Sequence, residues 1–226
     1  MIQIKEYTIK NPLKMIGEFA GICWGANIKE DKKNIKRAID CIVSGHERVE
    51  EFPDIYLVID GYSTKCIREL YTHIGGSPTR LQASTRYIDY EKKGVPVVVP
   101  HSVNNNPAAL AVWNAVVDNI KAGMASLKDL GIPNEDLTNL LPLAYQTKMI
   151  WKVNLRTLVH FMNMRLCSRA YWEIRELSNE IKKQLSDYSE EWKIIAEHLF
   201  VPKCEVVGYC TETKCCGRKP QQQQKW

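Results

Sequence analysis

The chain has 226 residues, of which 45% are hydrophobic and 25% are charged, and its formal net charge at pH 7 is +5. These values are ordinary for a globular protein, and a charge this mild fits an anionic ligand but does not indicate a nucleic-acid binder, whose basic residues usually gather in a stripe. No apolar run approaches the roughly 18 residues of a membrane span and the N-terminus lacks a signal-peptide core, so we expect a cytoplasmic protein with no membrane partner, whose eight cysteines are thiols or metal ligands.

Hydrophobic periodicity predicts strands and helices that follow one another along the chain. A short strand is expected over residues 2–9, and the continuous apolar run in "DIYLVIDGYS" predicts a buried strand over 55–59. Ser63 is expected to cap the helix after that strand, and the stretch 94–107 is typical of extended, turn-rich chain. Further helices are predicted over 13–24, 34–43, 107–130, 154–164, 170–185 and 189–200. These elements predict one α+β domain over residues 1–200, followed by a Cys-rich, basic extension over 201–226 whose tail "KPQQQQKW" is expected to be disordered.

The stretch "SPTRLQASTRY", residues 77–87, combines hydroxyl side chains with two arginines around Gln82. It is typical of a solvated loop, in which Ser, Thr and Pro favour turns and Arg80 and Arg86 stay in water. It is also typical of an anion site, because guanidinium groups and hydroxyls converge on phosphates. The local sequence leaves both interpretations open.

A second unusual stretch is "VNLRTLVHFMNMRLCSRAYWEIREL", residues 153–177. At helical spacing Asn154 and Arg165 fall near one face, whereas Arg156 and His160 fall near another. An amphipathic surface helix would keep its polar residues on one side. The pattern therefore predicts either a helix at a subunit interface or a helix that contacts a ligand.

The segment "LPLAYQTKMIWKVNLRTLVHFMNMRLCSRAYWEIREL", residues 141–177, resembles the C-terminal signature of the flavin-dependent thymidylate synthases. That signature pairs an Asn-x-Arg start with a later Arg and then Ala-Gln-Trp-Glu-Ile-Arg. Upstream parts follow in the family's order, namely Gly45-His46, "DIYLVIDGYS", "KCIRELYTH" and "STRY", so the resemblance spans residues 21–185. It implies the family's α+β fold, with an antiparallel or mixed sheet and long helices, in a homotetramer.

This chain departs from the family's pattern at the Arg-His-Arg motif, where it reads Thr72, His73 and Ile74. The spacing to Ser84 is about two residues longer, which accommodates the insertion "GGSPTR". Arg80 in that insertion is a candidate to replace one of the lost cations. Gln82 stands where a carboxylate is usual in the family.

The resemblance implies FAD-dependent methylation of dUMP to dTMP, with methylenetetrahydrofolate as one-carbon donor and NADPH as reductant. No enzyme cysteine attacks the uracil in this chemistry. By position, Ser84 and Arg165 would act in catalysis, with Arg165 facing the uracil carbonyl. The substrate would also contact Arg80, Gln82 and Arg86, and the flavin would be lined by His73, Asn154, His160 and Arg169.

Four cysteines lie close together in "PKCEVVGYCTETKCCGRKP", at positions 204, 210, 215 and 216. A zinc site needs about four thiolates that converge tetrahedrally, but this spacing lacks a Cys-x-x-Cys knuckle, so the prediction is that no metal is bound. Two alternative functions stay open. One is another flavin-dependent enzyme on pyrimidine nucleotides, or a flavin-binding protein, of the same fold. The other is a zinc-dependent nucleic-acid-binding protein.

Overall fold

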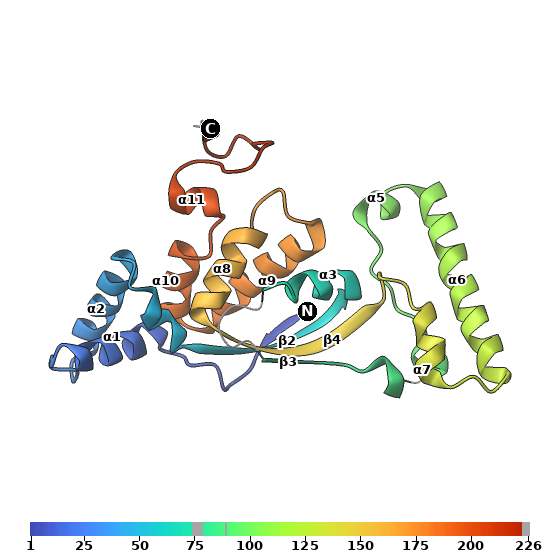
Figure 1. The fold of residues 1–226 in the computed structure, drawn as a ribbon, viewed down its shortest axis with the longest axis horizontal. Coiled ribbons are helices and arrows are strands. Elements are labelled where there is room, and N and C mark those ends of the chain that lie inside the picture. The colour runs from blue at the N-terminus through green and yellow to red at the C-terminus, as the bar shows by residue number, and fades with distance from the viewer. Residues whose placement is uncertain (74–78, 89, 223–226) are drawn as a thin grey trace. The chain divides into compact units, whose positions relative to one another are not determined.

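A computed structural model describes residues 1–73, 79–88 and 90–222 of the chain (Figure 1). Among the described helices, none is long and apolar enough to cross a membrane. The strands are β1 (Ile2–Ile4), β2 (Asp54–Ser63), β3 (Thr79–Gln82) and β4 (Gln146–Asn154). The α-helices are α1 (Pro12–Cys23), α2 (Asp31–Val43), α3 (Thr64–Leu70), α4 (Tyr90–Lys93), α5 (His101–Asn104), α6 (Pro107–Asp129), α7 (Asn134–Leu137), α8 (Leu155–Arg165), α9 (Trp172–Tyr188), α10 (Glu190–His198) and α11 (Lys203–Val207). Short 3-10 turns are η1 (Glu47–Glu51), η2 (Thr85–Tyr87) and η3 (Thr138–Leu140).

The four strands form one sheet in the order β1-β2-β4-β3, and β1 pairs antiparallel with β2 so that Ile2 lies opposite Ile59. Side chains alternate across a strand, and the burial of β2 and β4 follows that period of two. The alternating buried residues of β4 are Thr147, Met149, Trp151 and Val153, and Asn154 at the end of the strand is buried as well. No strand was predicted for this segment, although buried and exposed residues alternate regularly along it.

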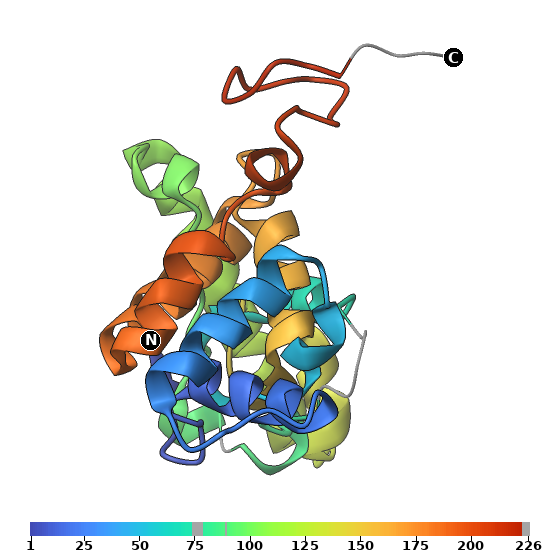
Figure 2. The same cartoon turned by 90° about the vertical axis from the view of Figure 1, so that its left-hand side faces the viewer.

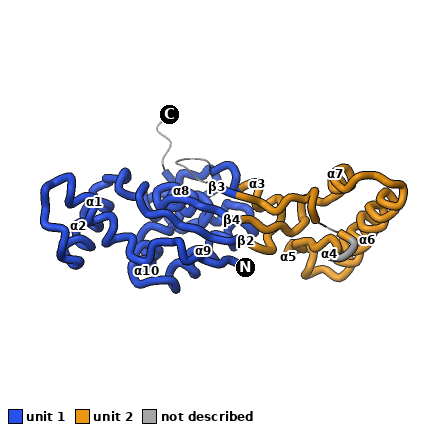
Figure 3. Tube along the Cα trace, turned by 90° about the horizontal axis from the view of Figure 1, so that it is seen from below, with its two compact units in different colours: residues 1–59, 70–80, 150–226 blue, residues 60–69, 81–149 orange. Residues whose placement is uncertain are grey.

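The chain divides into two compact units (Figure 3). Unit 1 comprises residues 1–59, 70–80 and 150–226, and unit 2 comprises residues 60–69 and 81–149. Strands β2 and β4 each contribute residues to both units. The division predicted at residue 200 stays a prediction.

The core of unit 1 gathers strand residues and one face of each of three helices. Helix α9 packs against β1 and against α10. Residues with less than 3% of their surface exposed include Ile55, Leu57, Ile59, Trp151, Phe161, Leu177, Ile181 and Trp192. Burial of this apolar surface is the main source of stability. The caps of α8 and α10 follow from sequence, since Asn154 Oδ1 accepts from Thr157 N and Ser189 Oγ accepts from Trp192 N.

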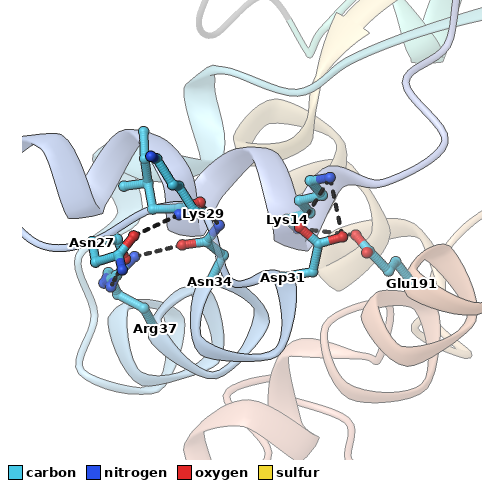
Figure 4. A network of polar contacts seen from close by, with 8 residues as sticks. Lys14, Asn27, Lys29, Asp31, Asn34, Arg37 and Glu191 are labelled. Atoms are coloured by element: carbon cyan, nitrogen blue, oxygen red, sulfur yellow. Dashed lines mark hydrogen bonds and ion pairs between the residues drawn. The ribbon is translucent and has the colours of Figure 1, made fainter.

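Helices α1 and α2 lie side by side in unit 1 (Figures 1 and 2). A Cβ atom added at Gly17 would lie 1.8 Å from the carbonyl oxygen of Asn34, so only glycine permits this approach. The fully buried Asn34 donates to Ile28 O and accepts from Arg37, which also donates to Gly17 O (Figure 4). A second group in the same view joins the two helices to α10 through Lys14, Asp31 and Glu191.

Unit 2 has its own apolar cluster of Val95, Met124, Leu137 and Tyr145. Helix α6 begins at Pro107, and Asn106 Oδ1 caps it by accepting from Ala108 N and Ala109 N. Ser63 Oγ accepts from Cys66 N, which confirms the predicted cap of α3.

Some predicted elements differ from the structure. The stretch 94–107, expected to be extended and turn-rich, contains the short helix α5. The strand expected over residues 2–9 ends at Ile4, because the Thr8 hydroxyl takes the place of ladder bonds, accepting from Tyr56 N at 3.0 Å and donating to Tyr56 O at 3.2 Å. The tail was expected to be disordered from residue 219, but Cys210 N donates to Pro220 O and Gln222 N donates to Cys210 O. That part of the prediction was wrong, and residues 223–226 lie outside the described chain.

Candidate functional site

Arg165, at the last position of α8, is held by the segment that follows α3. Its Nε donates to Nε2 of His73 at 2.8 Å, and its Nη2 donates to Oγ1 of Thr72 at 3.3 Å. Thr72 is one of the two positions where the resemblance predicts an arginine, and its hydroxyl is an acceptor for the guanidinium. Ile74, the other, lies outside the described residues.

His73 is buried, and its ring contacts two residues of α8. The ring centroids lie 5.8 Å from His160 and 5.1 Å from Phe161. Burial, the charge of Arg165 and the neighbouring His160 together lower the pKa of His73 to about 4. The ring is therefore neutral at pH 7, and because Nε2 accepts from Arg165, its proton sits on Nδ1.

A cavity of about 690 Å³ in unit 1 is lined by two of the predicted flavin residues, Asn154 and His160. Its other polar lining comes mainly from η1 and α8, and includes Glu50, Arg156 and Asn163. The volume lies within the range of about 300–1,000 Å³ that is usual for ligand sites. The structure thus brings together two residues that the sequence placed at one cofactor.

Glu50 is the most perturbed acid of this cavity. Burial, and after it the charge of Glu47, raises the pKa of Glu50 to about 7, while Arg156 partly offsets both effects. Arg156 pairs with Glu47 at 3.0 Å and also with Glu51, so the three glutamates share one cation. Neither Glu50 nor Arg156 was predicted as a site residue. The run "GHERVEEF" is the signal that could have drawn attention to them.

The other two predicted flavin residues, His73 and Arg169, do not line this cavity. Arg169 is exposed and lines a separate cavity of about 240 Å³ with cysteines of the C-terminal extension. In the described residues no group of three or more His, Cys, Asp or Glu side chains could hold a metal ion.

Ser84 and Arg86 lie together in unit 2, around η2. Ser84 Oγ accepts from Arg86 N at 3.3 Å, and Arg86 Nε pairs with Glu135 at 3.2 Å. Asn134 Nδ2 binds this segment from α7, because it donates to the carbonyl oxygens of Thr85, Arg86 and Ile88 at 3.2, 2.7 and 3.3 Å. Asn134 and Glu135 were not predicted, since they lie about 50 residues further along the chain.

Two further predicted substrate residues lie on β3. Gln82 Nε2 donates to Thr147 Oγ1 at 3.1 Å, within unit 2. In unit 1, the Arg80 guanidinium stacks 3.9 Å above the centroid of the Tyr71 ring. The stretch around them is a strand followed by a 3-10 turn rather than an irregular loop. Ser77 and Pro78 lie outside the described residues.

The chain is similar to proteins of one kind over most of its length. The family model described as "Thymidylate synthase complementing protein" matches residues 3–189. A relative from Pyrococcus abyssi named flavin-dependent thymidylate synthase is 36% identical over 171 residues, which is 74% of this chain and 69% of the relative. Another of that name from Pyrococcus furiosus is 31% identical over 220 residues, 93% of this chain and 89% of the relative.

Two solved structures share the fold. Thymidylate synthase X from Helicobacter pylori, determined with FAD and dUMP, matches with a TM-score of 0.69 at 19% identity, over 88% of this chain and 100% of that one. The UMP/dUMP methylase PolB from Streptomyces cacaoi, bound with 5-Br dUMP, matches with a TM-score of 0.74 at 14% identity, over 89% and 96%. At these identities, the two similarities show that the fold is shared.

Proposed function

The chain belongs to the flavin-dependent thymidylate synthases, a family of methyltransferases, and we propose that it converts dUMP to dTMP with FAD as cofactor, methylenetetrahydrofolate as one-carbon donor and NADPH as reductant. The observation that carries the proposal is the hydrogen bond between Arg165, at the end of α8, and the neutral His73, which follows α3. The N-cap of α8, Asn154, and its residue His160 line the large cavity. The relative from Helicobacter pylori, whose structure holds FAD and dUMP, supports the same ligands here.

The cavity of unit 1 fits part of a flavin dinucleotide in size and in chemistry. Asn154 and His160 would hold the cofactor through hydrogen bonds, with Arg156 as the cation for its phosphates. Glu50, half protonated near pH 7, presents less negative charge to such an anion than an ordinary glutamate would. When bound, the flavin supplies the electrons that reduce the transferred one-carbon unit to a methyl group.

By their positions in the family's sequence signature, Arg165, Ser84 and Arg86 would each contact the nucleotide, and Arg80 and Gln82 are further candidates. Arg165 is positioned before substrate arrives, because His73 and Thr72 already bind its guanidinium. A fixed cation at the uracil carbonyl stabilises the negative charge that develops there when the pyrimidine carbon attacks the one-carbon unit. Arg86 would exchange the exposed carboxylate of Glu135 for the phosphate.

We also propose that the chain works as a homotetramer. Of the 23 residues of α6, only Val117 and Met124 are buried, while Val112 and Val116 expose 66% and 53% of their surface. An apolar helix face of this kind is typical of a subunit interface. Sedimentation of the purified protein at about four times its 26.0 kDa mass is the expected result, and a monomer that binds flavin would contradict it.

A second candidate function is methylation of UMP, the ribonucleotide. The likeness in fold to the UMP/dUMP methylase is the observation that favours it. Turnover of UMP and of dUMP under the same conditions distinguishes the two candidates. Because the family is one of enzymes, the zinc-dependent nucleic-acid binder considered above is set aside.

The experiment that tests the main proposal is an absorption spectrum followed by a product assay. The purified protein is expected to show a flavin band that bleaches when NADPH is added without oxygen. Addition of dUMP and methylenetetrahydrofolate is then expected to restore the band and to yield dTMP by chromatography. A protein that binds no FAD, or that bleaches and forms no dTMP, would overturn the proposal.

A further inference from the structure

The C-terminal extension folds almost without a core. In the stretch 201–222, all of which the structure describes, Cys210 is the only buried residue. The segment is nevertheless closed into a loop, because Cys210 N donates to Pro220 O and Gln222 N donates to Cys210 O. Short segments that bury so little apolar surface usually need a covalent or metal cross-link to be stable.

Cysteine side chains meet where this loop closes. Cys210 N donates to Pro220 O, and Cys215 Sγ donates to the carbonyl oxygen of the preceding residue, Lys219, at 3.2 Å, so the two cysteines lie at the same end of the loop. Cys215 Sγ also accepts from Gly217 N at 3.3 Å. Cys210 is 6% exposed, whereas Cys215 is partly exposed, so the two thiols differ in their access to solvent.

We propose that Cys210 and Cys215 form a dithiol that low-molecular-weight disulfides, such as oxidised glutathione, convert to an intrachain disulfide. Cys215 is the attacking thiol, because solvent reaches it whereas Cys210 is buried. Cys210 accepts a backbone hydrogen bond from Glu212, but burial and the neighbouring Cys215 outweigh it and raise the pKa of Cys210. It therefore reacts second.

The exchange balances with one small disulfide. The Cys215 thiolate attacks one sulfur of glutathione disulfide, forms a mixed disulfide and expels the other half as a thiolate, which takes up the proton that Cys215 lost. The Cys210 sulfur then attacks the Cys215 sulfur, gives its proton to solvent or buffer, and expels the second glutathione. Two protein thiols are oxidised by two electrons, and one glutathione disulfide is reduced to two thiols.

Peptide mapping can identify the disulfide, because trypsin cleaves after the exposed Lys214, which lies between Cys210 and Cys215. The full chain is treated with oxidised glutathione, alkylated, and cut with trypsin without reduction. We expect the peptides 204–214 and 215–218 to remain joined, and the join to disappear after treatment with a reductant. Cys210→Ser and Cys215→Ser are each expected to abolish the joined pair.

Cys204 and Cys216 are matched controls, since each is carried by one of the two peptides and both line the same cavity as Cys210. Hydrogen bonds from Ser168 and from the Arg218 backbone lower the pKa of the exposed Cys216, so its reactivity alone would favour it over Cys215. The proposal expects Cys204→Ser and Cys216→Ser to keep the joined pair. Loss of the pair in Cys216→Ser, persistence in Cys210→Ser, mixed glutathione disulfides without any join, or stoichiometric zinc that blocks the oxidation would each overturn it.

Discussion

Arg165 donates from Nε to Nε2 of His73 over 2.8 Å, and the two residues are 92 positions apart in the chain. The contact requires an unprotonated Nε2, so the neutral imidazole ring is one of the groups that fix the direction of the guanidinium. A neutral acceptor orients the guanidinium without cancelling its charge. This arrangement suits a residue that must stabilise charge on a substrate.

Replacing Arg165 should weaken dUMP binding. Truncation of one partner of a desolvated charged hydrogen bond typically costs about 2–5 kcal/mol, so Arg165→Ala is expected to weaken the binding free energy of dUMP by that amount. Arg165→Lys should also bind more weakly, because an ammonium cannot reproduce the planar fork. Calorimetric titration with dUMP measures both losses, and thermal unfolding controls for folding. Unchanged affinity for dUMP in both variants would show that Arg165 does not bind the nucleotide.

The neutral state of His73 predicts how stability depends on pH. The pKa of this ring is about 4 in the folded chain and 6.5 in the unfolded chain, so the unfolded state binds more protons between these values. The stability contributed by the neutral ring is fully present above pH 6.5 and is lost as the pH falls through 4. The loss amounts to up to about 3 kcal/mol, because each pKa unit corresponds to about 1.4 kcal/mol. His73→Gln keeps an acceptor for Arg165 but does not titrate.

Denaturant unfolding of wild type and His73→Gln at pH 7 and pH 4.5 tests this dependence. The difference in unfolding free energy between the two proteins is expected to shift in favour of His73→Gln at the lower pH. A difference that stays constant would show that His73 does not titrate below its ordinary range.

Glu50 predicts the opposite dependence. Its pKa is about 7 in the folded chain and 4.5 in the unfolded chain, so the folded state binds the extra proton in that window. The associated stability is present below pH 4.5 and is lost as the pH rises through 7. Glu50→Gln should therefore raise the free energy of unfolding at pH 8, by up to about 3 kcal/mol.

Glu51 is the matched control for Glu50, because it lies in the same turn but is partly exposed and paired with Arg156. Glu51→Gln should change the unfolding free energy at pH 8 by about 1 kcal/mol or less. Equal effects of the two substitutions would indicate that burial does not perturb Glu50.

The exposed pair of Arg86 and Glu135 predicts a contrast between binding and stability. Both side chains are more than half exposed, so Glu135→Gln should alter stability by less than about 1 kcal/mol. The same change frees Arg86 for a phosphate, so dUMP should bind at least as tightly as to wild type. Arg86→Ala should bind dUMP more weakly. Weaker binding in Glu135→Gln would mean that the carboxylate orients Arg86 instead of competing for it.

The sequence predicted elements more reliably than contacts between them. Helices such as α6 and α8 could be predicted because caps and periodicity are local, and Asn106 and Asn154 mark their starts. Strand β4 was not predicted, although buried and more exposed residues alternate along it, as is typical of a half-buried strand. The N-terminal strand was predicted to be too long, because hydrophobic periodicity does not reveal the hydrogen bonds between the Thr8 hydroxyl and the Tyr56 backbone.

In the candidate site too, local relationships could be predicted and contacts between distant segments could not. Ser84 and Arg86 share one turn, so their proximity follows from spacing alone. The partner of Arg165 could not be predicted by spacing, since 92 residues separate it from His73. The perturbed Glu50 was missed because its pKa depends on burial, which is set by tertiary packing and not by its neighbours in sequence.

The last prediction concerns Arg80, which we expect to compensate for the arginines absent at Thr72 and Ile74. A dUMP phosphate is close to a dianion, and one cation pairs with it less well than two. The guanidinium of Arg80 stacks 3.9 Å from the centre of the Tyr71 ring, which restricts the side chain without neutralising its charge. A merely solvated arginine would not need such support.

Arg80→Ala separates the two interpretations of the stretch in which it lies. If Arg80 is a solvated surface residue, the substitution should change stability by about 0.5 kcal/mol or less and leave ligand binding unchanged. If Arg80 binds the phosphate, dUMP should bind more weakly, uridine should lose less because it has no phosphate, and flavin content should stay the same. Calorimetric titration of both ligands into wild type and Arg80→Ala measures the two losses. Tyr71→Leu, which removes the ring but keeps the cation, should give a smaller loss for dUMP than Arg80→Ala. Equal losses of affinity for dUMP and uridine, or no loss for either, would show that Arg80 is a solvated surface residue that does not bind the phosphate.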